Sequence, residues 1–427
     1  MKHIIHRSSV AGLGLLLAIL SLAAPAEEYG YPIKDKYAAT VVGTPPEYYA
    51  DLPKKIPFHT RRLVVFPDRE VPDVFFYDST MLYSVALQNK AAPLIFLIAG
   101  TGASHNGAKN EQMALAFYQA GFHVVSISSP TYTNFVISAS RTGVPGHAEH
   151  DAEDIYRVME KIHDLIKDDI EITGFNVTGY SLGGFHSAYV SKLDEERQSF
   201  NFDRVLLINP PVSLYNSISL LDRMAENIPG GVDNFNIFFD DLVRGFGEVY
   251  KRTRSDVSGG EFLYDAYKGM DLKNEELAAL IGVAFRLSSA SMVFASDVMT
   301  NYGYVKPANM ELDRYSDLTT FNLIVSRLGF TDYYHEFFYP YYRDTDSAGS
   351  RDSFVQSESL THIQDYLVST PKITVMHNED DIILEPGEID FFRDVFGDRA
   401  KIYPHGGHCG NMSYRDNVAH MVDTFTR

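Results

Sequence analysis

The sequence lacks tryptophan and contains one cysteine, Cys409, in 427 residues. A single cysteine excludes both an intramolecular disulfide and a four-cysteine zinc site, and the Gly/His-rich surroundings of Cys409 favour a small packing residue over a reactive thiol. Positive charge is also scarce, because 37 lysines and arginines stand against 56 acidic residues, a formal net charge of −19. This balance argues against a protein that binds nucleic-acid phosphates or an anionic membrane surface, since both need basic patches.

Apolar runs without charge are short after the N-terminus, and charges interrupt the later ones, so we expect no membrane span there. The first 26 residues differ. Lys2 and Arg7 precede an uncharged, mostly apolar run at 10–24, and Ala24-Pro25-Ala26 offers a small-x-small cleavage site. This pattern predicts a signal peptide over residues 1–26, with a run too short for a typical span. For a bacterial source, the mature protein is then periplasmic or secreted.

Strand-like runs alternate with helical patterns between residues 60 and 212. The run at 93–99 (PLIFLIA) is continuously apolar, as in a strand buried on both faces. Residues 150–167 place their apolar side chains on one helical face. Such alternation predicts an α/β fold, with a mostly parallel sheet flanked by helices.

The alternation stops after residue 212 and resumes at 371. Helical patterns fill the interval at 215–228, 234–251, 274–299 and 313–334. We therefore predict a first part of the α/β core at 27–212, a helical insertion at 213–370 and a second part of the core at 371–427.

The segment Gly179-Tyr180-Ser181-Leu182-Gly183 fits the pattern G-x-S-x-G between a predicted strand and a predicted helix. A serine hydroxyl needs to project toward a base to act as a nucleophile, and a tight strand-to-helix turn flanked by glycines projects it. The start of the following helix also supplies a backbone N–H, that of Leu182, which can stabilise an oxyanion.

Two histidines in the C-terminal loop Tyr403–Gly410 are candidates for the base. We prefer His408 to His405 as the group that takes the proton from Ser181 and returns it to the leaving group. A metal site in this loop is not expected, because no third ligand is evident.

A carboxylate that orients the base is expected after an earlier strand. Asp380 and Asp381 both follow the predicted strand at 372–377. We prefer Asp380 and keep Asp381 as the alternative. The resulting order Ser…Asp…His differs from the orders of other serine hydrolase folds.

Together, these motifs resemble those of the α/β-hydrolase superfamily, over roughly half of the chain. The resemblance implies Ser181 as nucleophile, Asp380 as acid and His408 as base. It also implies that the loop Ala99-Gly100-Thr101-Gly102 gives a second oxyanion donor, the N–H of Thr101, although Ala99 stands where a histidine is common. The helical insertion matches the usual position of a cap. The resemblance requires neither a cofactor nor a metal.

An aromatic stretch at 333–342 within the insertion either lines a pocket for an apolar group or packs the cap on the core; we prefer the packing role. The sequence thus predicts an exported serine hydrolase that acts on a small ester-like molecule. Cleavage of an amide, peptide or thioester by the same residues is the first alternative, and a binding protein without turnover is the second.

Overall fold

The described part of the chain contains one eight-stranded sheet. The computed structural model describes residues 29–231, 234–253, 260–270, 272–345 and 349–426. The strand order is β1-β2-β4-β3-β5-β6-β7-β8. β2 pairs antiparallel with β1 and β4, and the other pairings are parallel. The strands are β1 (His59–Leu63), β2 (Met81–Ala86), β3 (Ala92–Ile98), β4 (His123–Ile127), β5 (Ile172–Tyr180), β6 (Arg204–Ile208), β7 (Ile373–Asn378) and β8 (Ala400–Tyr403).

The central strands are apolar throughout because helices cover both faces of the sheet. In β3 every residue from Leu94 to Ile98 is fully buried, whereas β1 at the edge exposes His59 and Thr60. α4 and α5 cover one face together with α15, and α2 and α16 pack on the other. The predicted fold class, a mostly parallel sheet flanked by helices, is confirmed. These helices are α2 (Ala108–Gln119), α4 (Ala148–Ile166), α5 (Leu182–Arg197), α15 (Glu388–Phe396) and α16 (Arg415–Thr426).

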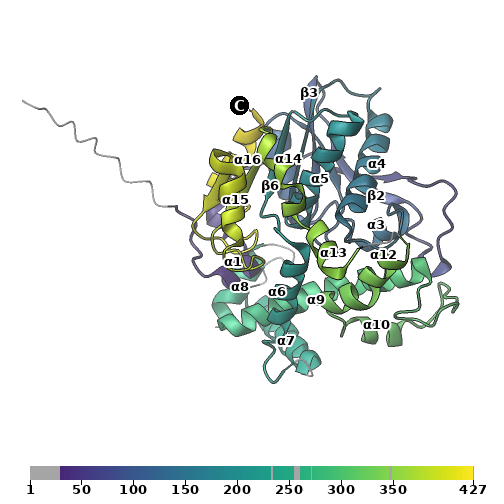
Figure 1. Ribbon diagram of the computed structural model, residues 1–427. Helices are drawn as coiled ribbons and strands as arrows, with labels where there is room; N and C mark the ends of the chain where they lie inside the picture. The colour runs from purple at the N-terminus through teal and green to yellow at the C-terminus, as the bar shows by residue number, and fades with distance from the viewer. Residues whose placement is uncertain (1–28, 232–233, 254–259, 271, 346–348, 427) are drawn as a thin grey trace, which may run out of the picture. The chain divides into compact units, whose positions relative to one another are not determined.

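A long helical segment connects β6 to β7, and no described residue within it belongs to the sheet. In Figure 1 most of its helices, coloured teal to green, gather below the sheet, whereas the helix labelled α14 lies beside it. The pattern at 313–334 predicts one helix, and this is wrong: residues up to Leu318 are not helical, and Gly329 separates α10 from α11. The helices of the segment are α6 (Leu214–Ala225), α7 (Phe235–Thr253), α8 (Gly260–Met270), α9 (Asn274–Thr300), α10 (Thr319–Val325), α11 (Phe330–Tyr333), a π-helical turn η4 (Tyr334–Phe338), α12 (Tyr339–Thr345), α13 (Arg351–Ser357), η5 (Leu360–Ile363) and α14 (Gln364–Ser369).

The last part of this segment packs with the core. Leu360, Ile363 and Leu367 belong to the same buried apolar cluster as the sheet and α5. The end of the predicted insertion at 213–370 therefore packs directly on the sheet and α5.

One described helix, α9, has the length and apolar composition of a membrane span, which the sequence reasoning did not expect. Its apolar window is 67% buried inside the protein, as in a core helix. The predicted signal peptide at 1–26 lies outside the described residues.

Short helical elements complete the chain. α1 lies near the start of the unit formed by residues 31–427 and contacts α8 and α9. Its residues Ala38, Ala39 and Val42 are buried. These elements are α1 (Lys36–Val42), η1 (Pro46–Tyr48), η2 (Asp73–Phe75), α3 (Thr133–Ser138) and η6 (Gly397–Arg399).

Candidate active site

Ser181 occupies the turn between β5 and α5. Its backbone has a positive φ, with φ 55° and ψ −127°, and its N–H donates to the carbonyl of Ile208 at 2.8 Å. A Cβ on Gly183 would lie 2.1 Å from the carbonyl oxygen of Ile98, and one on Gly179 would lie 2.4 Å from the backbone of Gly183. The two glycines of the motif therefore permit a strained turn that a side chain at either position would prevent.

His408 lies against the Ser181 hydroxyl. The two atoms that meet are His408 Nε2 and Ser181 Oγ, 2.9 Å apart. The loop that carries His408 lies between β8 and α16, and its backbone has positive φ at Gly406, Gly407 and Cys409. The sequence-predicted base thus lies within hydrogen-bond distance of the sequence-predicted nucleophile. His405 points elsewhere, with its Nε2 2.9 Å from the carbonyl oxygen of Tyr31.

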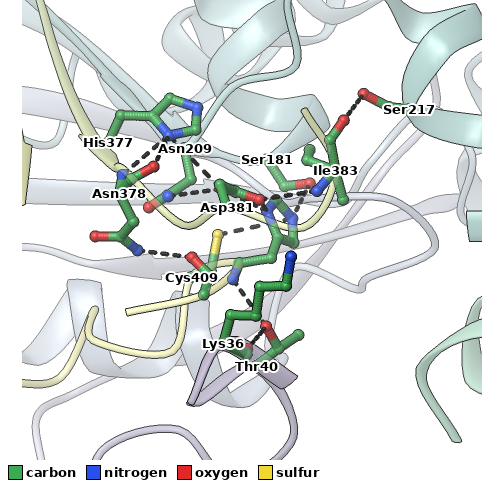
Figure 2. A network of polar contacts seen from close by, with 12 residues as sticks. Lys36, Thr40, Ser181, Asn209, Ser217, His377, Asn378, Asp381, Ile383 and Cys409 are labelled. Carbon is green, nitrogen blue, oxygen red and sulfur yellow. Dashed lines mark hydrogen bonds and ion pairs between the residues drawn. The ribbon is translucent and has the colours of Figure 1, made fainter. Parts of the chain in front are cut away.

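The carboxylate beside His408 belongs to Asp381. His408 Nδ1 lies 3.0 and 3.1 Å from the two carboxylate oxygens of Asp381. Figure 2 shows Asp381 within the polar network that also contains Ser181, Asn209 and Ile383. The preference for Asp380 is wrong. The Asp380 carboxylate instead accepts the N–H of Gly407 at 2.9 Å, so it supports the loop of His408 rather than the imidazole.

Two further contacts hold the Asp381 carboxylate. Asn209, directly after β6, donates from Nδ2 at 2.8 Å, and the N–H of Ile383 donates at 3.1 Å. His377 is buried nearby, with Nδ1 3.6 Å from Asp381 and Nε2 3.0 Å from the carbonyl of Pro210. Sequence reasoning missed Asn209 and His377. Their position at the carboxyl ends of β6 and β7 is the one signal that points to them, because the site lies at this edge.

The charges of Asp381 and His408 follow from these contacts. Burial raises the pKa of the Asp381 carboxyl, but the facing imidazole of His408, then that of His377 and the N–H of Ile383, outweigh burial and hold this pKa below its usual value. For His408, burial alone favours the neutral ring, yet the charge of Asp381 and the nearby Cys409 sulfur raise its pKa above 6.5. Asp381 is therefore a carboxylate that stabilises a charged His408.

Cys409 is buried next to His408, with its Sγ 3.9 Å from His408 Nε2. Figure 2 shows the sulfur pointing toward the network. The Cys409 thiol therefore lies at the site, although the sequence favours a packing role.

The predicted oxyanion donors lie on two elements that border Ser181. Leu182 is the first residue of α5, so its N–H has no partner within the helix. Thr101 lies in the loop after β3, and the next residue, Gly102, donates its N–H to the hydroxyl of Thr131 at 2.8 Å. Leu182 and Thr101 line the same cavity as Ser181.

This cavity lies between the sheet and the helical segment, and its volume is about 100 Å³. Ser181 and His408 form one part of its wall. Its other walls are mainly apolar and come from α6, α9 and the region of α11 and η4; they include Leu214, Ile218, Leu221, Phe285, Met292 and Phe330.

The aromatic stretch of the insertion serves both of the roles considered. Tyr333, Tyr334 and Phe338 line the cavity, whereas Phe337 and Tyr342 are fully buried in an apolar cluster. Among the described residues, no group of three or more His, Cys, Asp and Glu side chains is arranged to hold a metal ion.

The strand order, the strained serine between β5 and α5 and the chain order of Ser181, Asp381 and His408 decide the fold. The chain has the α/β-hydrolase fold. Its sheet has one antiparallel strand, β2, and its helical segment is inserted after β6, the strand next to the serine-bearing β5.

No protein-family model matches the sequence, and no curated protein matches it. Distant similarity to solved structures exists. A Legionella pneumophila protein assigned as a hydrolase aligns at a TM-score of 0.47 and 11% identity, covering 91% of this chain and 93% of that one. A serine hydrolase of Cycloclasticus zankles aligns at 0.41 and 12%, covering 86% and 96%. A proline iminopeptidase of Mycobacterium smegmatis aligns at 0.40 and 16%, covering 86% and 98%. At these TM-scores, the similarity adds nothing to the α/β-hydrolase assignment.

Proposed function

We propose that the protein is a serine hydrolase that cleaves a carboxylic ester through an acyl-enzyme on Ser181. The observation that carries the proposal is the chain of contacts from Ser181 Oγ to His408 Nε2 and from His408 Nδ1 to Asp381, at 2.9 and 3.0 Å. A hydroxyl, an imidazole and a carboxylate in this order are the elements of nucleophilic acyl transfer.

In the proposed first step, His408 Nε2 takes the proton of Ser181 while Oγ attacks the ester carbonyl carbon. Asp381 stabilises the imidazolium that forms. The N–H groups of Leu182 and Thr101 stabilise the oxyanion of the tetrahedral intermediate. Collapse of this intermediate breaks the ester bond, and the proton on His408 passes to the departing alcohol.

In the second step, His408 takes a proton from a water molecule, and the resulting hydroxide attacks the acyl carbon on Ser181. The acid product leaves and Ser181 Oγ regains its proton from His408. The apolar walls of the cavity favour a substrate with an apolar acyl or alcohol part. The contacts of Ser181 alone do not choose between an ester, an amide and a thioester, so all three belong in the test.

The test compares wild type with Ser181→Ala and with Ser369→Ala. Ser369 is exposed at the end of α14, and its hydroxyl donates to the carbonyl of Asp365 at 2.7 Å. We expect a fluorophosphonate to label Ser181, and we expect Ser181→Ala to lose both labelling and hydrolysis of p-nitrophenyl esters. Ser369→Ala keeps both. Turnover by folded Ser181→Ala contradicts the mechanism. Faster turnover of an arylamide or thioester than of the matched ester would contradict the ester and indicate an amide or thioester substrate.

We also propose that the protein is exported with cleavage after Ala26, which the pattern at residues 1–26 supports. Mass spectrometry of the protein recovered from the periplasm or medium of an expressing bacterium tests this. A mature N-terminus at Glu27 is expected, and an intact Met1 in the cytoplasm contradicts the proposal.

A further inference from the structure

Two polar groups in the apolar cavity have no role in the proposed reaction: the carboxyl of Glu358 and the hydroxyl of Tyr334. Both residues line the cavity that contains Ser181, and both are buried. The other cavity hydroxyls for which contacts are known have partners, such as Tyr333, which donates to the carbonyl of Pro145 at 2.9 Å. The Tyr334 hydroxyl has no hydrogen-bond partner among the described residues.

The Glu358 carboxyl has hydrogen-bond donors but no positive partner. It accepts from the N–H of Ala148 and, at 3.2 Å, from the hydroxyl of Ser357. No described Lys or Arg forms an ion pair with it. His147 Nδ1 lies 3.6 Å away, but burial lowers the pKa of His147 to about 3, so this ring is neutral. The neighbouring charged groups, Asp151 and Glu149, are both acids.

An ionised carboxyl without a counter-charge is unfavourable in such surroundings. Burial accordingly raises the pKa of Glu358 to about 8. A cation placed in the cavity would restore the missing charge and favour the ionised carboxylate. An anion placed there would instead oppose ionisation of Glu358 and gain no counter-charge from it.

We propose that Glu358 is a specificity-determining residue that binds an ammonium group of the substrate, with the Tyr334 hydroxyl as a second polar contact. This inference depends on the proposed function, because it names the substrate class for the cavity of Ser181. The substrate is then an ester whose apolar part ends in, or carries, an amine.

The experiment compares p-nitrophenyl 6-aminohexanoate with p-nitrophenyl heptanoate, which replaces the ammonium by a methyl group. For wild type, we expect kcat/KM to be at least tenfold higher for the ammonium ester. In Glu358→Gln, which retains an acceptor for the N–H of Ala148, this preference should disappear while kcat for the heptanoate stays within a few-fold. Glu196→Gln, an exposed position on α5, should keep the preference.

An equal preference in wild type and Glu358→Gln, or no preference in wild type, overturns the role of Glu358. Calorimetric binding of hexylammonium and of hexanol to Ser181→Ala measures the same preference without turnover. Tighter binding of hexylammonium than of hexanol that depends on Glu358 supports the inference even if neither ester is hydrolysed. Resistance of both esters to hydrolysis would count against the proposed ester cleavage but not against the role of Glu358.

A second observation concerns α1, which lies against the loop of His408. The Thr40 hydroxyl accepts the backbone N–H of His408 at 2.8 Å and donates to the carbonyl of Lys36 at 2.7 Å, and Figure 2 shows Thr40 and Lys36 within the network of the site. A Cβ on Gly407 would lie 2.2 Å from the Lys36 carbonyl oxygen, and one on Gly410 would lie 2.1 Å from that of Ala39. Loop and helix therefore meet backbone to backbone.

We infer that Thr40 is a positioning residue, which keeps the His408 imidazole in line with Ser181 by holding its backbone N–H. The helix that supplies it begins only a few residues after the start of the compact unit at Tyr31. Helix α1 thus supports the proposed catalytic residues, although it acts on the reacting atoms only through His408.

The test compares Thr40→Val with Thr40→Ser. Valine keeps the shape but removes the acceptor, so we expect kcat to fall about tenfold with little change in KM, and serine to restore it. Thr424→Val is the control, because Thr424 makes the same type of bond, to the carbonyl of His420 at 2.9 Å, on the distant helix α16. An unchanged kcat in Thr40→Val, an equal loss in Thr424→Val, or no rescue by serine overturns the role of Thr40.

Discussion

Replacing Asp381 and Asp380 by asparagine, one at a time, separates two adjacent acids that differ in their contacts. The Asp381 carboxylate receives donors on both oxygens: Asn209 Nδ2 on one, the N–H of Ile383 on the other, and His408 Nδ1 between them. An amide at 381 has one oxygen, so its nitrogen must face a donor, which costs about 1–3 kcal/mol for a buried unsatisfied group. If that nitrogen donates to His408, Nδ1 must accept, which leaves the proton on Nε2 where the base must be free.

We therefore expect Asp381→Asn to lower kcat by about 10⁴-fold, the size known for the wrong tautomer in a serine protease triad. This equals about 5.5 kcal/mol of activation free energy. Asp380→Asn keeps an oxygen for the N–H of Gly407 and should stay within about tenfold of wild type, since one neutral hydrogen bond is worth about 1 kcal/mol. The assay is kcat for a p-nitrophenyl ester. A thousandfold loss in Asp380→Asn with near-normal turnover in Asp381→Asn would refute the assignment of the acid.

Further expectations concern pH, the thiol and the serine turn. Asp381 raises the pKa of His408, and a protonated ring cannot accept the Ser181 proton. We therefore expect kcat/KM to rise with pH to an inflection above 6.5. A flat profile from about pH 5 to 8, a range that spans the ordinary histidine pKa, counts against His408 as the base. Cys409→Ala should shift that inflection downward in the same titration, because the sulfur 3.9 Å from Nε2 contributes to the raised pKa, and an unmoved inflection shows that it does not. Gly183→Ala should lower the free energy of unfolding by about 1–3 kcal/mol in denaturant unfolding, because the new Cβ would clash with the Ile98 carbonyl. Gly247→Ala on α7, where a Cβ meets open space, should be neutral or stabilising. Equal effects of the two variants would show that crowding does not explain the glycine at 183.

The fold and two of the three central side chains follow from local signals in the sequence. The apolar run at 93–99 has the composition of a doubly covered strand, and the structure places β3 there. Ser181 is recognisable because the turn needs glycines at fixed offsets, and His408 because a glycine-rich loop follows a strand. Each of these signals is carried by residues close together in the chain.

The choice between Asp380 and Asp381 has no such local signal. Both follow β7, both are acidic, and neighbouring side chains of one turn point in different directions. What selects Asp381 is Asn209, 172 residues away in sequence, whose amide holds one carboxylate oxygen. The pattern at 313–334 misleads for a related reason. Its apolar residues fit one helix, but Asp222 of α6 binds the N–H groups of Phe330 and Thr331 and so starts a new helix after Gly329.

The distinction between local sequence signals and long-range contacts also separates the chemistry of the site from its substrate selectivity. The proposed nucleophile, acid and base follow strands of the sheet, so strand order brings them to one edge whatever the inserted helices do. The groups that would select a substrate come from the insertion, and long-range contacts place them: Glu358 reaches Ala148 across 210 residues. Sequence patterns can therefore indicate the reaction class of such a chain, whereas its substrate depends on contacts that only the folded arrangement of α4 and the insertion displays.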